Sequence, residues 1–334
     1  MLLVQFKARL SVTISLVWLL TAVAGFATRP AGTDKLVSEE AKLYWALDKL
    51  LTQRQSSKAK QMVKANAEVA RNLLANLLFV RLDLELELEE TASLSLRMNE
   101  VMELLAPVAD ESLVKLMNLV EEVKQGSNPF RNEVGGLAEA LAVFVDAAKS
   151  DDPDEQIRLW QIAAQKCDEL GLELGKIVCL FRLAKSQRDK GELIAAFNHF
   201  SQTKELLEQW NYEALLPALL NGLGVTLYRL GLLETAWQQF SAALEFARRQ
   251  GNEHEQGKAL TNLSAIAIQI GNFRLAAEFL QEAIEHGKTV ARLTNLGVVH
   301  INLRDYENAL LVSREAMELA QKEGDLRRQI TLWN

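Results

Sequence analysis

Histidines, cysteines and carboxylates are the side chains that could carry catalysis or hold a metal in this chain, and their spacing favours neither. None of the histidines is spaced with a cysteine or a carboxylate as metal ligands are; they are His199, His254, His286 and His300. The sequence has no G-x-S-x-G, H-E-x-x-H or Gly-rich phosphate loop, and no Cys–His pair in the context of a nucleophile. We therefore expect no enzymatic activity, no cofactor and no bound metal.

Two acidic runs, "ELELEE" and "SDDPDE", are the remaining candidates for an ion site. The second is typical of a helix start, with Asp at the cap and Pro153 in the first turn. Runs of like charge usually form solvated faces. We expect no ion at either run.

Cys167 and Cys179 flank a turn around residues 171–175, where two antiparallel helices would bring them together. Two cysteines are too few for a disulfide-framed scaffold, and free cysteine is often simply buried. Export from the cytoplasm would favour a bond between them. The sequence leaves both states of the pair open.

The composition indicates a helical protein without affinity for nucleic acid. Of 334 residues, 49% are hydrophobic and 24% charged, and Pro occurs only five times, so long helices are favoured and a large sheet is not. The net charge is −7 and the pI is about 5.4. Binding to a phosphate backbone would need a clustered excess of Lys and Arg. We expect an all-α fold and no nucleic-acid partner.

The first residues are typical of a secretory signal. Lys7 and Arg9 precede an uncharged run over 10–27, and Ala22 and Ala24 have the spacing of a cleavage site. We expect a signal peptide over 1–24, cleavage before Gly25, and a periplasmic or secreted product. The alternative is a membrane anchor over 10–27, which would be the chain's only contact with a membrane.

A repeated unit of forty residues dominates the second half of the chain. Four sets of positions recur at this interval: Gly191, Gly231 and Gly271; Ala196, Ala236 and Ala276; Phe200, Phe240 and Leu280; Ala184, Gly224 and Ser264. Each unit reads as two amphipathic helices, with small residues where the helices approach and an aromatic residue that plugs between units. Such units bury their apolar faces only by stacking into a solenoid.

This pattern resembles the tetratricopeptide repeat, and "LGVTLYRLGLLETAWQQFSAAL" matches it throughout. The unit from Gly297 departs from it, with Arg304 at the turn and Ser313 in place of the aromatic residue. The period resembles that of kinesin light chains and of bacterial proteins that carry such repeats before a caspase-like (CHAT) peptidase domain. The resemblance implies a right-handed superhelical solenoid of antiparallel helix pairs over 135–334.

The residues before the array are expected to be helical as well. We place a linker at 25–35, a helical region at 36–126 and a second linker at 127–134, where "QGSNPFRNE" interrupts the pattern. The region contains either degenerate repeats or an N-terminal cap. Its "RLDLELELEE" alternates like a strand, but no second strand-like run could pair with it, so we expect a helix.

The last residues, "TLWN", resemble the start of another repeat, so we expect the chain to be part of a longer protein. Two functions are then open. The chain is either an interaction scaffold that holds a partner segment on the concave face of the solenoid, or the sensing arm of a larger enzyme, such as a CHAT peptidase, with a catalytic domain beyond residue 334.

The resemblance implies that the first helix of each repeat lines the concave face. The expected peptide-binding groove comprises Arg182, Lys185, Asn221, Tyr228, Lys258, Asn262, Asn295 and Asn302, with Asn334 at the next equivalent position. Asparagine amides both donate and accept, so they can pair with an extended peptide backbone. The cations would attract an acidic segment or a free C-terminus. The alternative is that the amides bond between neighbouring helices.

Overall fold

The structure is a computed structural model that describes residues 38–86, 92–123, 128–210 and 212–322. Every regular element in these ranges is a helix, so the all-α expectation is confirmed. The expected signal peptide, the 25–35 linker and Asn334 lie outside the described residues. No helix in the described ranges is long and apolar enough to cross a membrane.

The helices before the array are α3 Glu39–Thr52, α4 Ser56–Ala65, α5 Ala67–Leu86, α6 Ala92–Leu105, the short η1 Ala106–Val108 and α7 Glu111–Glu122. After them come η3 Pro129–Asn132, α8 Gly136–Lys149, α9 Pro153–Glu169, α10 Glu173–Lys190, α11 Leu193–Trp210, η4 Glu213–Leu215, α12 Leu216–Arg229, α13 Leu233–Gln250, α14 Glu253–Gln269, α15 Phe273–Glu285, α16 Val290–Asn302 and α17 Tyr306–Lys322. The stretch 81–86 of the alternating segment is helical, as expected, within α5.

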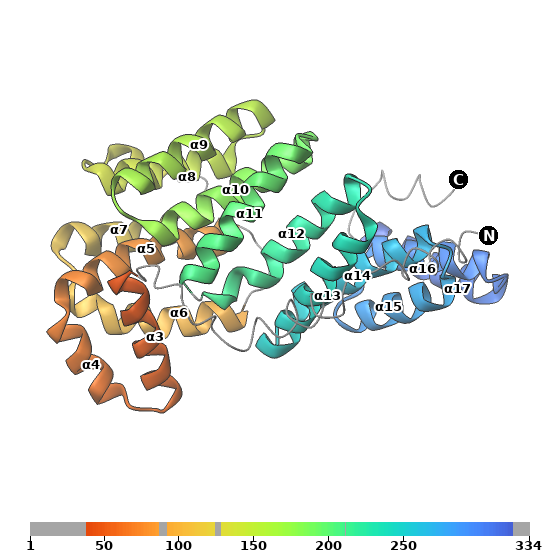
Figure 1. Cartoon of the computed structure of the whole chain (residues 1–334), viewed down its shortest axis with the longest axis horizontal. Helices are drawn as coiled ribbons and strands as arrows, with labels where there is room; N and C mark the ends of the chain where they lie inside the picture. Colours follow the sequence, from red (N-terminus) through yellow and green to blue (C-terminus); the bar gives the residue numbers. More distant parts are fainter. Residues whose placement is uncertain (1–37, 87–91, 124–127, 211, 323–334) are drawn as a thin grey trace, which may run out of the picture. The chain divides into compact units, whose positions relative to one another are not determined.

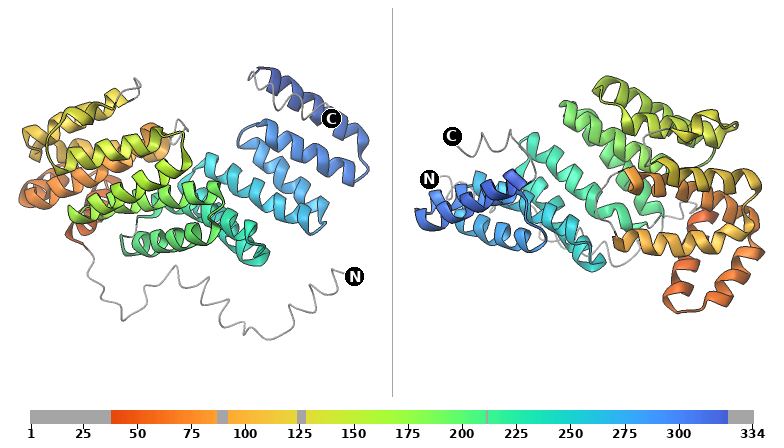
Figure 2. Two further views of the ribbon diagram at one scale, coloured as in Figure 1. Left: turned by 90° about the horizontal axis from the view of Figure 1, so that it is seen from above. Right: turned by 180° about the vertical axis from the view of Figure 1, so that it is seen from behind.

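From α8 onward, successive helices pair as hairpins, and each pair packs on the next to form a solenoid (Figure 1). Figure 2 shows the same succession from α12 to α17, coloured from teal to blue. The tight turn inside each pair needs a left-handed residue. Gly231 has φ 79° there, and its N–H and that of Leu232 close the end of α12 on Tyr228 O and Leu227 O. At the equivalent turn after α16, Arg304 adopts φ 61°.

Aromatic side chains packed on glycines fix the repeat register. Phe200 and Phe240 are both buried, as the repeat pattern predicts. A Cβ on Gly224 of α12 would lie 2.5 Å from a ring carbon of Phe240, and one on Gly222 would lie 2.8 Å from the ring of Phe200. Only the missing side chains at these glycines allow the helices to approach so closely.

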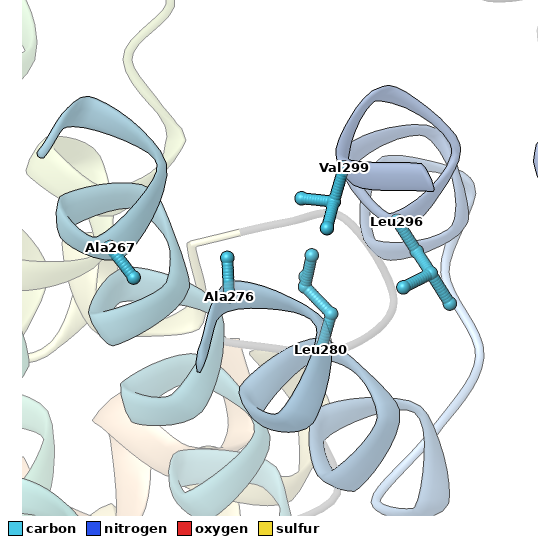
Figure 3. Close-up of a cluster of buried hydrophobic side chains, with 5 residues drawn as sticks. All are labelled: Ala267, Ala276, Leu280, Leu296 and Val299. Carbon is cyan, nitrogen blue, oxygen red and sulfur yellow. The ribbon is translucent and has the colours of Figure 1, made fainter. Parts of the chain in front are cut away.

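The contact between α15 and α16 is made by smaller, aliphatic side chains. Figure 3 shows Leu280 of α15 pointing toward Val299 of α16, with Ala276 beside Ala267 of α14. Leu280 stands where the preceding units carry Phe, and its side chain is fully buried. The step from this unit to the next one, α16 and α17, is short because α15 has 13 residues, whereas α11 and α13 have 18 each.

Helix α5 packs directly against the first helix of a repeat, α10. Asn76 Oδ1 accepts from the backbone N–H groups of Leu174 and Gly175 at 2.9 and 3.2 Å, which satisfies the open start of α10. Phe79 of the same helix contacts Phe144 of α8 edge to face. The helical region before the array therefore covers part of the array itself.

Cys167 and Cys179 are both free and fully buried in the structure. Burial raises the pKa of the Cys179 thiol well above its usual value, and the neighbouring Cys167 raises it further. The two thiols therefore meet, as the position of the turn predicts, and burial favours the neutral form of the Cys179 thiol.

Candidate functional site

The first helices of four successive repeats line one hollow of about 380 Å³. The residues that line it come from α10, α12, α14, the connection before α16, and α16: Phe181, Lys185, Arg188, Ala218, Asn221, Gly222, Val225, Glu255, Lys258, Thr261, Asn262, Thr289, Ala291 and Arg292. Its volume falls within the usual range of ligand pockets, roughly 300–1,000 Å³. Among the residues that the structure describes, no second helix of a repeat contributes to its lining.

Four of the eight groove residues expected from the sequence line this hollow: Lys185, Asn221, Lys258 and Asn262. Tyr228 and Asn295 are half-buried on the same helices and do not line it. Asn302 is exposed, and its amide bonds to Val298 O one turn earlier in its own helix at 2.8 Å. The expected row of asparagines is therefore brought together only in part.

Arg182 lies in a different place from the other expected groove cations. Its guanidinium pairs with Asp83 of α5, and both residues line a separate hollow of about 210 Å³ with Trp160. Arg182 is thus paired with α5 and does not line the larger hollow. Lys185 lines both hollows and lies 5.5 Å from the ring of Phe181.

The amides in the hollow bond between neighbouring helices. Asn221 Nδ2 donates to Glu255 Oε2 at 2.6 Å and to Glu255 O at 3.3 Å, which ties α12 to α14. Asn262 Nδ2 donates to Asn221 Oδ1 at 3.5 Å, at the limit of a hydrogen bond. For Asn221, the alternative that the amide bonds between neighbouring helices is therefore the one that the structure shows. Asn262 Oδ1 accepts no bond from the described residues and is available to a ligand.

Cations outnumber carboxylates around the hollow. Lys185, Arg188, Lys258 and Arg292 line it together with a single carboxylate, Glu255. Glu255 is buried and accepts from Lys258 Nζ at 3.2 Å as well as from Asn221. The chain as a whole carries a net charge of −7, so this positive site is a local exception.

Arg292 is the lining residue that the sequence patterns did not identify. It is 7% exposed, and desolvation lowers the pKa of its guanidinium. The preceding units carry Leu219 and Ala259 at the same repeat position, five residues before the small residue. An arginine at a position that is apolar and buried in the other units was the signal that could have found it.

The described residues contain no group of three or more His, Cys, Asp or Glu that could hold a metal ion. His199 Nδ1 lies 2.7 Å from Gln187 Oε1, and burial lowers the pKa of this imidazole. Its interactions are those of a satisfied side chain between α10 and α11.

Comparisons with known proteins identify the repeats. Residues 215–289 and 291–323 each match a family model described as "Tetratricopeptide repeat". The chain therefore contains tetratricopeptide repeats over this stretch. Over 137 residues, 38% of the chain, it is 26% identical to the human outer dynein arm-docking complex subunit 4. The match spans about a fifth (20%) of that relative's length.

Solved structures share the fold over most of the chain. A Rap conjugation gene regulator of plasmid pLS20, in complex with the Phr* peptide, is 19% identical with a TM-score of 0.52 over 78% of each chain. Aspartyl phosphate phosphatase F from Bacillus subtilis is 15% identical, TM-score 0.55, over 91% of this chain and 79% of that one. NprR in complex with its cognate peptide NprX is 12% identical, TM-score 0.52, over 78% and 82%.

Proposed function

We propose that this chain is an interaction scaffold that binds a peptide segment of a partner protein on the face formed by the first helices of its repeats. The observation that carries the proposal is the hollow lined by α10, α12, α14 and α16. It combines amide groups, which suit a peptide backbone, with a cluster of cations on an otherwise acidic chain. An acidic segment or a free C-terminus fits that charge.

Structural relatives support a peptide as the ligand. Two of the solved structures that share this fold, the pLS20 regulator and NprR, are complexes with peptides. At 19% and 12% identity, these two structures show a shared fold alone. Peptide binding by this chain is therefore a proposal.

A selection from a random octapeptide library on the immobilised chain, followed by fluorescence anisotropy, tests the proposal. The double variant Lys185→Ala with Asn262→Ala, two residues that line the hollow, should bind a selected peptide about tenfold more weakly, because each lost hydrogen bond is worth about 0.5–1.5 kcal/mol. Asn198→Ala, an exposed asparagine on the second helix α11, is the matched control and should bind normally. Unchanged affinity of a double variant with wild-type circular dichroism would move the site off this face.

The export of the chain and its lack of catalysis belong to the same proposal. The signal-like residues 1–24 support a periplasmic or secreted scaffold, and the absence of a catalytic motif in the sequence supports a binding function. N-terminal sequencing of exported material should find Gly25 first. An intact Met1 in a membrane fraction would instead make 10–27 an anchor.

A second candidate is the sensing arm of a larger protein. A signal transduction ATPase from Pyrococcus horikoshii, described as having a tetratricopeptide repeat sensor, matches 88% of this chain over only 48% of its own length. This coverage favours a role as one part of a multidomain protein, of which the CHAT peptidases are one kind. The full open reading frame decides: a downstream His and Cys set in an α/β pattern favours the sensor, and a stop codon after one capping helix favours the scaffold.

A further inference from the structure

The two cysteines lie opposite each other where one helix pair of the array packs on the next. Cys167 is on α9, the second helix of its pair, and Cys179 is on α10, the first helix of the following pair. A Cβ on Gly175 would lie 3.1 Å from Cys167 Sγ, and Cys179 follows Gly175 by one helical turn on the same face of α10. The two thiols interact through a hydrogen bond. The Cys167 sulfur therefore lies against the face of α10 that carries Cys179.

Later junctions between helix pairs indicate that these two repeat positions face each other. At forty-residue steps, buried and matched apolar pairs occupy the same two positions: Leu207 with Leu219, and Ala247 with Ala259. At the next junction, after the shortened helix, the positions hold Gly287 and Arg292, and the Arg292 guanidinium donates to the Gly287 carbonyl. Cys167 and Cys179 thus take the place of a pair of residues whose contact the fold itself specifies.

We propose that Cys167 and Cys179 form a covalent redox site, in which a small-molecule disulfide such as oxidised glutathione converts the two thiols into a disulfide that ties α9 to α10. The thiolate of one cysteine attacks the oxidant, which forms a mixed disulfide and releases one glutathione thiol. The second cysteine then attacks the protein sulfur of that mixed disulfide and releases the second thiol. Two electrons pass to the oxidant, and the two protons end on the released thiols. This site is separate from the peptide site and does not depend on peptide binding.

Burial decides when this bond can form. Both cysteines are fully buried, and burial raises the pKa of the Cys179 thiol, so the packed chain offers little thiolate to an oxidant. The ring of Phe79 on α5 also covers this face of α10, because a Cβ on Gly175 would lie 2.9 Å from it. We therefore expect the bond to form while the chain folds, before α5 has packed on α10.

The bond would strengthen the place where the helical region before the array is attached. Asn76 of α5 accepts hydrogen bonds from the N–H groups of Leu174 and Gly175, close to the thiols along α10. A disulfide that holds α10 on α9 would keep these N–H groups in position for Asn76.

The competing explanation is that the cysteines only fill an apolar pair position as small buried hydrophobes. This explanation predicts two independent thiols, whereas the redox site predicts that they react with each other. The sequence contains no other cysteine, so only one intramolecular pairing is possible.

Oxidative refolding of the full chain tests the proposal. The chain is unfolded in urea with reductant, diluted into a buffer of reduced and oxidised glutathione, alkylated and digested with trypsin. Trypsin cleaves after Lys166, Lys176 and Arg182, so the cysteines fall in separate peptides, 167–176 and 177–182. Mass spectrometry should find these peptides linked in most molecules. A sample that has folded under reductant should form the link at least about tenfold more slowly in the same buffer.

Hydrogen exchange then shows whether the bond ties the helices. Amides of α10 should open at least about tenfold less often in the oxidised chain than in the reduced one. The double variant Cys167→Ala with Cys179→Ala copies the Ala247–Ala259 pair of a later junction and is the matched control. Its exchange should be the same in both buffers.

Four results would overturn the inference. The refolded chain could yield unlinked peptides, glutathione could remain attached to either cysteine, the link could form equally fast in the packed chain, or it could form and leave exchange in α10 unchanged. The comparison of oxidised and reduced wild-type chain needs no variant to fold, so these results are decisive even if the alanine pair fails to fold.

Discussion

The forty-residue units and the shortened unit after them are held together by different kinds of contact. In the regular units, rings pack onto glycines, as Phe240 does onto Gly224, and Gly231 makes the turn between the helices. In the shortened part, Leu280 replaces the ring and Arg304 takes the strained turn position. Arg292 there bonds to Thr261 and Gly287 and so links α14 to the connection before α16.

This difference shows where a repeat array can acquire a site. Apolar packing that recurs at a fixed period leaves little freedom to place a buried charge. A shorter second helix changes the path of the connection and admits an arginine at a position that is apolar elsewhere. The same place borders the hollow, so the local break in the period and the candidate binding site coincide.

The largest expected loss of stability comes from removing an aromatic ring that is buried between regular units. Phe240→Ala should lower the free energy of unfolding by about 3–5 kcal/mol, the usual cost of emptying a buried Phe site. Phe197→Ala, at a ring that is 37% exposed on α11, should cost roughly 1 kcal/mol and serves as the control. Urea denaturation measures both. An equal effect of the two changes would mean that the repeat register is wrong.

Two glycine-to-alanine substitutions, one in each region, compare the packing around the first helices directly. Gly224→Ala should destabilise the chain by about 1–3 kcal/mol, because the new Cβ meets the Phe240 ring. The new Cβ of Gly297→Ala would lie 3.1 Å from Ser313 Oγ and 3.5 Å from Val312 Cγ2, with no ring in its way, so this change should raise stability by up to about 1 kcal/mol through helix propensity. Melting temperatures of the two variants check this. If both lose stability alike, the two regions do not differ in packing as described.

The smallest expected effect concerns the turns. Arg304→Gly should stabilise the chain by about 1 kcal/mol, because a left-handed backbone costs a non-glycine residue roughly that much. Gly231→Ala should lose a similar amount at the equivalent turn. Differential scanning calorimetry of the two variants measures the change in stability. A loss of stability in Arg304→Gly would show that the arginine side chain contributes more than its backbone costs.

The repeat fold was predictable because its signals are local and recur. Small residues, turn glycines and aromatic residues at fixed spacing gave the helix pairs and their buried rings. The site was predictable only in part. Arg182 was assigned to the groove because nothing near it in sequence announces Asp83, 99 residues earlier. Arg292 was missed because its bonds depend on the path of a shortened connection.

Site-directed photo-crosslinking shows whether a bound peptide lies on the face formed by the first helices. A benzophenone amino acid replaces Val225, which lines the hollow, or Glu278, which is exposed on the second helix α15 and does not line it. Each variant is irradiated with a peptide selected on the wild-type chain, after circular dichroism has shown a wild-type fold. We expect a crosslink from position 225 and none from position 278. A crosslink from 278 alone would contradict this expectation, because the peptide would then lie on the opposite side of the helix pairs.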